Sequence, residues 1–496
     1  MKQTVLIAGA GLAGMATALR LAKRGYDVTI LEKNESPGGR LNRLEQDGFT
    51  FDTGPTFFSM SYEFEEFAKD CGIELPFRYH AVDPLYTVNF GVDDNNYTLH
   101  RNLNKLASEF REAEPGFEVK MKHFLRKTGQ LFHDSMDIVV RQNFDSAYDY
   151  FSKLSKVNKI HLPFVFSTVR KEVDNCFESE EVRQIMSLSA YFLGNSPEKT
   201  NGVYSLLSYT EFIYDGYHNV EGGMYEIVRG LEHELQKTGV RILCNREITD
   251  YGSKEDKVTA LKDKEGNTYR ADHFIINSDA LLFRSRILKR NKYNEKRLKK
   301  MDWSMGMMTI YVGLDCKLDQ IALHNYYIGR KSDTHSMNNF GNSKIPESPY
   351  FYVNVPSRYN KTHAPEGCEA LMFVVPVPNL LHKKEWNDAG YIAENILKEF
   401  SARIGMNILP HIRTKKIFTP ESWQDRYNLY SGAALGLSHS MQQTGGLRPS
   451  NKDEKFVNLY YTGSSTVPGI GLPMAIISSR LTAERVIGQR IEPVYT

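Results

Sequence analysis

The hydrophobic pattern at the start of the chain predicts a strand, a turn, a helix and a second strand. Residues 4–8 (Thr-Val-Leu-Ile-Ala) form a short apolar run, which is typical of a strand buried on both faces. A turn at residues 9–14 follows, and residues 15–23 have helical character. Residues 27–31 form the second predicted strand, which ends at Glu32. This order of elements is that of a Rossmann unit.

The turn has the glycine spacing of a dinucleotide-binding site. Gly9 permits the tight turn, Gly11 lets the backbone approach a pyrophosphate, and Gly14 lets the helix pack on the strand. N–H groups at the helix start would then face the anion. Glu32 follows Gly14 by 18 residues, where a carboxylate accepts hydrogen bonds from ribose hydroxyls and disfavours the 2′-phosphate of NADP. A purely structural glycine turn is the alternative, and the flanking strands favour dinucleotide binding over it.

Two further segments distinguish FAD from NAD. Gly39 and Arg40 come just after the second strand. The guanidinium of Arg40 can bind a phosphate whose negative charge the helix N-terminus only partly neutralises. The alternative is an exposed turn with a surface arginine. Gly54-Pro55 is a turn signal, and such a turn could pass close to a flat ring.

The C-terminal segment has a similar order of elements. Residues 458–462 are a predicted strand, residues 463–471 a glycine-rich loop, and residues 473–487 an amphipathic helix. Pro473 stands at the helix start, where its missing N–H costs nothing. A helix N-terminus aimed at a flavin would stabilise negative charge on the reduced ring. A second structural strand–turn–helix is the alternative.

Because both ends of the chain predict the same nucleotide site, we expect an α/β fold in which separated segments build a Rossmann-like FAD-binding domain. We assign residues 1–70, 218–285 and 415–496 to it, and residues 71–217 and 286–414 to a mixed sheet and helical substrate domain that faces a membrane. Within the FAD-binding domain we predict a helix over 224–237, a strand over 240–245 with residues 247–248 as its end, and a hairpin-like pair of strands over 257–262 and 268–271. Within the substrate domain we predict mainly helices over 104–215 and strands within 303–315 and 349–376.

Composition excludes several classes of protein. The formal charge of +2 over 496 residues argues against nucleic acid as a partner. The five cysteines form no CxxC pair, which favours a reducing compartment. The 14 histidines show no ligand-spaced pair, so we expect no metal. Residues 5–19 imitate a secretory segment but contain three glycines, and no apolar stretch reaches the length of a membrane span. We expect a cytoplasmic protein that lies peripherally on the inner face of the cell membrane.

Two basic segments bear on membrane contact. Residues 153–171 place lysines and arginines on both sides of the apolar run 160–166, a pattern typical of an interfacial segment. A core helix with charged ends is the alternative. Residues 284–300 carry nine Lys or Arg residues, and a solvated helix face is favoured there over a patch that binds membrane phosphates.

Several motifs together resemble those of a known family. The spacing E-K-x(5)-G-G-R from Glu32, joined to Asp52-Thr53-Gly54-Pro55, and the C-terminal stretch 459–473 are similar to the FAD-binding signatures of phytoene-type bacterial carotenoid desaturases, in the amine-oxidase-like flavoprotein group. Residues 221–224, 277–279 and 432–451 also resemble that family. Val467 departs from the histidine that many members carry, so the subtype stays open and includes the hydroxycarotenoid or monocyclic 3,4-desaturase branch.

The resemblance implies FAD as cofactor and a carotenoid as substrate. The reaction would insert C=C bonds into a C40 acyclic or monocyclic carotenoid and transfer hydride to flavin. Flavin is needed because no side chain can accept a hydride. We therefore assign no catalytic acid or base. Membrane quinone or oxygen would reoxidise the flavin. The candidate cofactor-binding residues are Gly9, Gly11, Leu12, Ala13, Gly14, Glu32, Lys33, Gly39, Arg40, Gly54, Pro55, Ile248, Gly463, Gly471, Pro473 and Met474.

Three alternatives share parts of this pattern. A carotenoid terminal-methyl oxidase would use the same scaffold. An amine-oxidase-type flavoenzyme would act on a polar amine and should hold an aromatic cage near the flavin. A flavin-containing carotenoid-binding protein without activity would keep FAD but give no substrate-dependent reduction.

Overall fold

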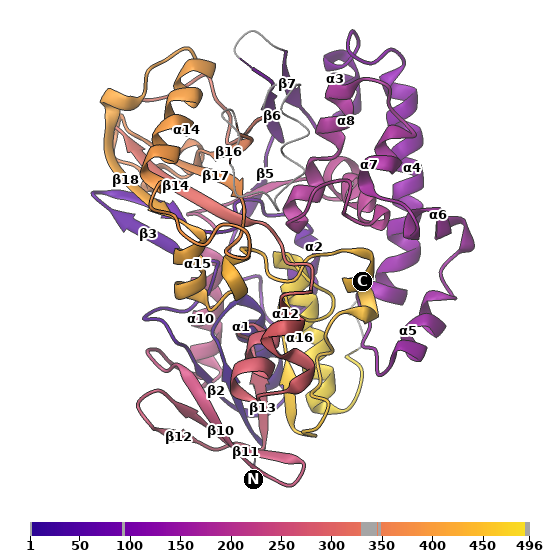
Figure 1. The fold of residues 1–496 in the computed structure, drawn as a ribbon, viewed down its shortest axis with the longest axis vertical. Helices are drawn as coiled ribbons and strands as arrows, with labels where there is room; N and C mark the ends of the chain where they lie inside the picture. Colours follow the sequence, from indigo (N-terminus) through magenta and orange to yellow (C-terminus); the bar gives the residue numbers. More distant parts are fainter. Residues whose placement is uncertain (1, 92–94, 329–344, 346–348, 492–496) are drawn as a thin grey trace.

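A parallel sheet forms the base of the molecule in the computed structural model, which describes residues 2–91, 95–328, 345 and 349–491 (Figure 1). Its five strands lie in the order β19-β13-β1-β2-β9, and every neighbouring pair is parallel. The strands are β1 (Thr4–Ala8), β2 (Asp27–Leu31), β9 (Arg241–Leu243), β13 (His273–Ile276) and β19 (Leu459–Tyr461). The two strands predicted at the N-terminus and the one near the C-terminus are confirmed, and they lie in one sheet.

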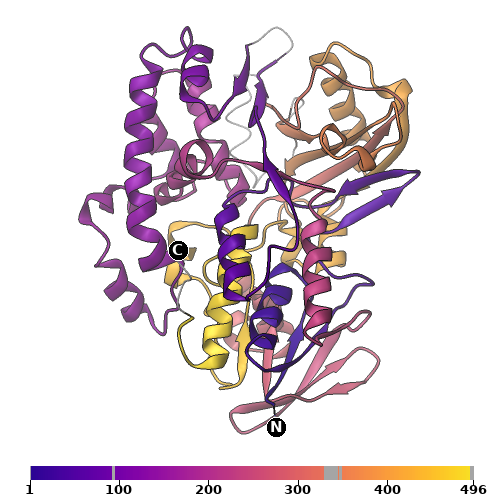
Figure 2. The ribbon, with the colours of Figure 1, turned by 180° about the vertical axis from the view of Figure 1, so that it is seen from behind.

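Both faces of this sheet are covered, which explains why β1 is apolar throughout. Val5 and Ile7 pack with helices α1 (Leu12–Ala22), α10 (Glu226–Lys237) and α16 (Leu472–Ile487). Leu6 and Ala8 face the opposite way, toward the antiparallel strands β10 (Ile248–Lys254), β11 (Lys257–Asp263) and β12 (Thr268–Tyr269). Figure 2 shows the yellow C-terminal helix α16 beside the indigo α1, so the two ends of the chain pack together.

A second, larger sheet lies above the parallel one (Figure 1). Its order is β18-β14-β17-β16-β15-β6-β7, antiparallel except where β15 pairs with β6. Helix α14 (Ala389–Arg403) packs its apolar side chains on one face of this sheet. The strands are β6 (Tyr86–Asn89), β7 (Asn96–Leu99), β14 (Gly306–Leu314), β15 (His324–Tyr327), β16 (Phe351–Asn354), β17 (Glu369–Val377) and β18 (Ile412–Phe418). The predicted strands within 303–315 and 349–376 are confirmed.

A block of helices covers the remaining side, as predicted for residues 104–215 (Figure 1). Its α-helices are α3 (Leu103–Glu109), α4 (Phe117–Ser135), α5 (Ala147–Leu154), α6 (Leu162–Val165), α7 (Val169–Asp174), α8 (Glu180–Met186) and α9 (Leu206–Tyr209). Single turns of other helix types link them, namely η1 (Met136–Val140), η2 (Lys159–His161), η3 (Leu188–Leu193), η4 (Gly202–Ser205) and η5 (Thr210–Tyr214). Within the described residues, none of the helices has both the length and the apolar composition that a membrane span requires.

Shorter elements join these parts. The strands are β3 (Arg43–Gln46), β4 (Phe49–Asp52), β5 (Tyr79–Ala81) and β8 (His218–Val220). The α-helices are α2 (Ser61–Asp70), α11 (Ala280–Leu282), α12 (Glu295–Leu298) and α15 (Pro420–Tyr427). The remaining single turns are η6 (Phe283–Ile287), η7 (Asn291–Tyr293), η9 (Pro356–Arg358), η10 (Lys361–His363), η11 (Leu409–His411), η12 (Tyr430–Gly432), η13 (Met441–Gln443) and η14 (Gly445–Leu447).

The predicted domain boundaries stay a prediction, but strand β18 bears on one of them. The strand runs from Ile412 to Phe418 and so crosses the boundary proposed at residue 415. It pairs with β14, so this part of the chain belongs to the larger sheet.

The basic segment 284–300 is solvated as favoured over most of its length, with seven of its nine Lys and Arg residues exposed and Arg284 as the buried exception. It is divided among η6, η7 and α12, and Arg284 is fully buried. The guanidinium of Arg284 lies 3.6 Å from the ring centroid of Tyr461 and donates to the carbonyl of Ser450. Stacking of a delocalised cation on an aromatic face explains why this arginine is inside the protein.

Candidate cofactor and substrate site

The glycine turn after β1 is so tightly packed that side chains are excluded. Gly9 has a φ of +110°, and a Cβ on Gly14 would lie 2.3 Å from the carbonyl oxygen of Gly9. A Cβ on Gly11 would lie 2.9 Å from Oδ1 of Asn277. Gly9 and Gly14 therefore act as predicted. Gly11 has an additional reason to be glycine, because Asn277 fills the space beside it.

Asn277 connects the N-terminal turn to the C-terminal loop. It follows β13, its Oδ1 accepts a hydrogen bond from the Gly14 N–H at 2.9 Å, and its Nδ2 donates to the Thr462 carbonyl at 3.2 Å. A Cβ on Gly463 would lie 2.8 Å from the same Nδ2. We did not assign Asn277 to the site from the sequence, although its position at a strand end in the motif 277–279 was a usable signal.

Glu32 is held in place at the end of β2. Only 5% of the residue is exposed, its Oε2 accepts from the Ala10 N–H at 2.7 Å, and its Oε1 accepts from the Asn34 N–H at 2.8 Å. Burial raises the pKa of the Glu32 carboxyl, and the two backbone donors oppose that shift. A fixed acceptor at this position suits ribose hydroxyls, as the sequence predicts.

Lys33 is already engaged with another part of the chain. Its Nζ donates to the Asp425 carbonyl at 2.6 Å and to Oδ1 of Asn428 at 2.9 Å, and it lies 3.7 Å from a carboxylate oxygen of Glu247. The lysine thus joins the end of β2 to the end of α15. Ile248, at the start of β10, lies along the same cavity.

Arg40 spans the gap between the N-terminal and C-terminal segments. Its Nη1 donates to the Ala434 carbonyl at 3.0 Å and its Nη2 to the hydroxyl of Ser464 at 2.6 Å. A Cβ on Gly54 would lie 2.0 Å from the carbonyl oxygen of Arg40, so Gly54 must be glycine for this turn to form. Burial lowers the pKa of the Arg40 guanidinium, and the Asp279 carboxylate opposes that shift. The surface-arginine alternative is therefore wrong.

The C-terminal loop brings the start of α16 to the same cavity. Gly463 and Gly471 have φ values of +103° and +123°, and the Gly463 N–H donates to the Ser478 hydroxyl at 2.9 Å. Pro473 occupies the first turn of α16, where no intrahelical donor is needed. Of the sixteen residues predicted to bind the cofactor, fifteen line one cavity of about 950 Å³. Gly14 lies behind it, against Gly9 and Asn277.

The residues of this cavity fit a flavin dinucleotide. A buried carboxylate stands at the end of β2, the helix start of α1 faces the space, and glycines permit close approach of the backbone. Since β2 lies on one side of β1, an adenosine held by Glu32 leaves the flavin half over the loops that follow β13 and β19. Gly54, Pro55 and residues 463–471 line that half.

Beyond the cofactor residues, the cavity ends among buried aromatic side chains. We call this the inner end; Phe57 lies at its centre, with ring centroids 4.6 Å from Tyr217 and 5.3 Å from Tyr352. The Tyr352 hydroxyl bonds Thr56 Oγ1 at 2.9 Å and His324 Nδ1 at 2.6 Å. Burial lowers the pKa of His324 to about 3, so the ring is neutral and orients Tyr352. Tyr326 and Tyr350 complete the inner end.

The opposite end of the cavity reaches the surface at the helical block. We call this the mouth; it is formed by α5, η2 and α6. Phe151, Leu162 and Phe166 line the cavity there and are also 54%, 49% and 74% exposed. An apolar channel therefore leads from solvent past the cofactor residues to the inner end.

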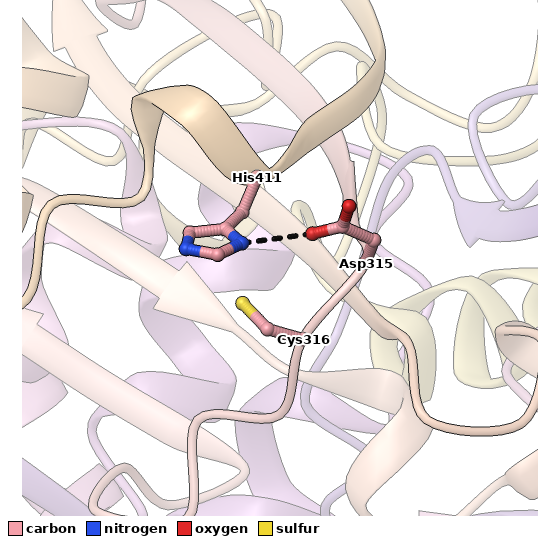
Figure 3. A group of neighbouring side chains, drawn as sticks. All are labelled: Asp315, Cys316 and His411. Carbon is pink, nitrogen blue, oxygen red and sulfur yellow. Dashed lines mark hydrogen bonds and ion pairs between the residues drawn. The ribbon is translucent and has the colours of Figure 1, made fainter.

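One cluster elsewhere has side chains of the kind that bind metals. His411 Nδ1 lies 2.9 Å from Asp315 Oδ1, and Cys316 is beside them (Figure 3). The three come from the end of β14 and the turn before β18, and none lines the cavity. Arg413 pairs with the other oxygen of Asp315, and His411 followed by Arg413 lowers the pKa of that carboxyl. The arginine competes with a cation for the carboxylate, and the expectation of no metal stays a prediction.

Comparison with known proteins agrees with this geometry. The family model of flavin-containing amine oxidoreductases matches residues 12–487. A zeta-carotene-forming phytoene desaturase of Myxococcus xanthus is 32% identical, with 97% of this chain and 93% of the relative covered. A carotenoid 3,4-desaturase of Haloarcula japonica is 30% identical, with 98% of each chain covered. The chain belongs to the flavin-containing amine oxidoreductases, in the carotenoid desaturase family. It is therefore an FAD-dependent oxidoreductase.

The fold is also found among solved structures. An oxidoreductase from Methanosarcina mazei matches with a TM-score of 0.64 at 16% identity, over 96% of this chain and 98% of the other. The Rossmann-like fold class predicted from the sequence is confirmed. Neither the terminal-methyl oxidase nor the amine-oxidase alternative is favoured by the relatives.

Gly11→Val should abolish retention of FAD. The added side chain would displace Asn277 and enter the cavity where the pyrophosphate is expected. The measurement is flavin absorbance of the purified protein after gel filtration. Gly390→Val is the matched control, because nothing lies within 4 Å of a Cβ at that glycine. A Gly11→Val protein that stays as yellow as the control would show that the dinucleotide does not bind here.

Glu211, which lies behind the inner end, should make stability depend on pH. It is 6% exposed, its Oε1 has no hydrogen-bond partner within the described chain, and burial raises its pKa to about 7 from an ordinary 4.5. The folded state then binds more protons than the unfolded state, so stability falls as pH rises from about 4.5 through 7. The loss is about 3 kcal/mol above pH 7.

Glu211→Gln removes this titration while keeping the shape of the side chain. Melting temperatures measured at pH 5 and pH 8 should differ less for Glu211→Gln than for the wild type, since every other group titrates equally in both proteins. Equal pH dependence of the two proteins would contradict the raised pKa.

Proposed function

We propose that this protein desaturates a C40 acyclic or monocyclic carotenoid by removing hydride and proton from a saturated bond next to the polyene. One observation carries the proposal: a single cavity joins the dinucleotide fold to an apolar channel that ends in buried aromatic rings. The names of the two relatives support a carotenoid as the substrate class. The polar amine of an amine-oxidase-type enzyme would not suit the apolar side chains at the mouth.

The chain's own residues would align the substrate and exclude water. FAD, when bound, supplies the hydride acceptor that side chains cannot provide. Aliphatic and aromatic walls hold a nonpolar chain without hydrogen bonds, and closure of the inner end by Phe57 and the surrounding tyrosines keeps water out. A positive charge left on carbon would spread over the polyene, so a strong protein base is not needed.

We further propose that the mouth rests on the inner face of the cell membrane as a peripheral contact. Ile160 and Phe166 are 63% and 74% exposed, which argues against the core-helix alternative for this segment. Lys156 and Lys159 are exposed beside them, in the arrangement of an interfacial segment. A hydrocarbon substrate could then pass from the acyl chains into the cavity without crossing water. Contact with the membrane would also bring quinone within reach as electron acceptor, and oxygen is the alternative.

Production of this protein in a bacterium that accumulates an acyclic carotenoid should yield more conjugated pigments. Absorption should shift to the red and each desaturation should lower the mass by two hydrogens, because only hydrogen is removed. Mass spectrometry of the extracted pigments checks this, with the Gly11→Val protein as the negative control. A product that gains oxygen would indicate the terminal-methyl oxidase, and unchanged pigment would indicate a carotenoid-binding protein.

Leu162→Glu together with Phe166→Glu should weaken binding to vesicles of phosphatidylglycerol and phosphatidylcholine. The charges would have to leave water to enter the interface, and we expect at least a tenfold loss of affinity in sedimentation. Tyr391→Glu is the control, because Tyr391 is 71% exposed on α14, away from the mouth. Equal sedimentation of the double variant and the control would refute the membrane contact.

A further inference from the structure

Arg448 is a buried arginine whose hydrogen bonds all go to the backbone. Only 3% of the residue is exposed. A guanidinium has five N–H donors, and here each of the five has a carbonyl acceptor. The acceptors are the carbonyl oxygens of Leu437 at 3.1 Å, Ser438 at 3.0 Å, Gln443 at 2.9 Å, Ser464 at 2.8 Å and Thr466 at 3.2 Å.

These contacts join the two loops that border the flavin half of the cavity. Leu437, Ser438 and Gln443 belong to the segment that begins at Ala434, and Ser464 and Thr466 belong to the loop after β19. Ala434, Ser464 and neighbouring residues of both loops line the cavity. Arg448 lies behind them. Its charge is therefore placed next to the flavin half without blocking it.

The charge of Arg448 is offset only at longer range, by the Asp279 carboxylate that also acts on Arg40. None of the carboxylates in the described chain forms an ion pair with it, in contrast to the buried Arg284, which pairs with Glu454 at 3.4 Å. Burial lowers the pKa of Arg448 to about 10, so the guanidinium is still charged at neutral pH. Carbonyl dipoles solvate the cation but do not cancel its charge.

Arg40, Asp279 and His439 are ionisable residues that line the flavin half of the cavity. Burial lowers the pKa of the Arg40 guanidinium, and the nearby Asp279 carboxylate opposes this shift. Burial keeps the pKa of His439 well below its usual range, so this imidazole is neutral. Arg40 and Arg448 share the single carboxylate of Asp279, so one positive charge of this group is left in surplus.

We propose that Arg448 is an electrostatic positioning residue, which stabilises the negative charge that flavin acquires on reduction and so makes bound FAD a stronger oxidant than free FAD. The low dielectric of a buried site strengthens this effect of a fixed charge. The same five hydrogen bonds hold the two loops together. The inference deepens the proposed desaturation, because hydride removal from a hydrocarbon needs a strong acceptor, but it concerns only the cofactor and can be tested without a carotenoid.

The test is the midpoint potential of bound flavin, measured against reference dyes under anaerobic conditions. Reduced FAD should bind wild-type protein at least tenfold more tightly than oxidised FAD, which corresponds to about 30 mV for two electrons. Arg448→Lys should keep this preference, since it keeps the charge. Arg448→Gln should lose it. Arg284→Gln is the matched control, because Arg284 is also buried but paired, and it should keep the preference.

A second variant covers the case in which Arg448→Gln does not fold or hold FAD. Ser438 is fully buried, its hydroxyl has no partner within the described chain, and its carbonyl accepts from Arg448. Ser438→Asp would add a negative charge on a residue whose carbonyl binds Arg448, so it should offset the positive charge and also lose the preference. A wild-type affinity ratio near one, or a full preference in Arg448→Gln or Ser438→Asp, would overturn the proposal. Failure of desaturation alone would leave it standing, since the potential is measured without substrate.

Discussion

The side-chain amide of Asn277 is the contact on which the cofactor site depends, because it binds both ends of the chain at once. It accepts from Gly14, 263 residues away, and donates to Thr462, 185 residues away. The glycines on either side have no room for a Cβ because this amide fills the space. A hydrogen bond contributes about 0.5–1.5 kcal/mol, so these two bonds favour forming the turn and the C-terminal loop together. The predicted cofactor-binding residues of both segments can line one cavity only when this contact is made.

The cavity contains two environments with opposite chemistry. Around the dinucleotide, Glu32, Arg40 and Arg448 are fixed by backbone or hydroxyl partners, so their charges do not have to reorganise when charge changes on the cofactor. Toward the mouth and the inner end, the walls are aliphatic and aromatic. A reaction that moves hydride from a hydrocarbon onto the cofactor needs this division, since a polar wall on the substrate side would admit water.

The sequence predicts local structure well and long-range partners poorly. The strands β1, β2 and β19 and the helix α16 were found because their own residues determine them. The pairing of β15 with β6 could not be predicted, since it joins segments 238 residues apart at Asn325 and Thr87 and has no local signal. For the same reason the burial of Arg284 within an otherwise solvated basic run could not be predicted, since its partner is an aromatic ring from another segment. Of the site, fifteen of sixteen predicted residues line the cavity. The residues that hold them there, Asn277 and Arg448, were missed because their partners are backbone groups.

The exposed aromatic side chains of the mouth lower the stability of the folded chain in water, and the proposed membrane contact would offset that cost. Burying apolar area is worth about 25 cal/mol per Å², so leaving Phe151 and Phe166 in water forfeits stability and invites aggregation. Both also line the cavity, so the same side chains that are unfavourable in water form the start of the channel. A polar mouth would remove the cost but would place a hydrated ring between a lipid-soluble substrate and the cofactor. Under the proposed membrane contact, acyl chains would cover the mouth when the protein works, and the membrane would then form part of the site.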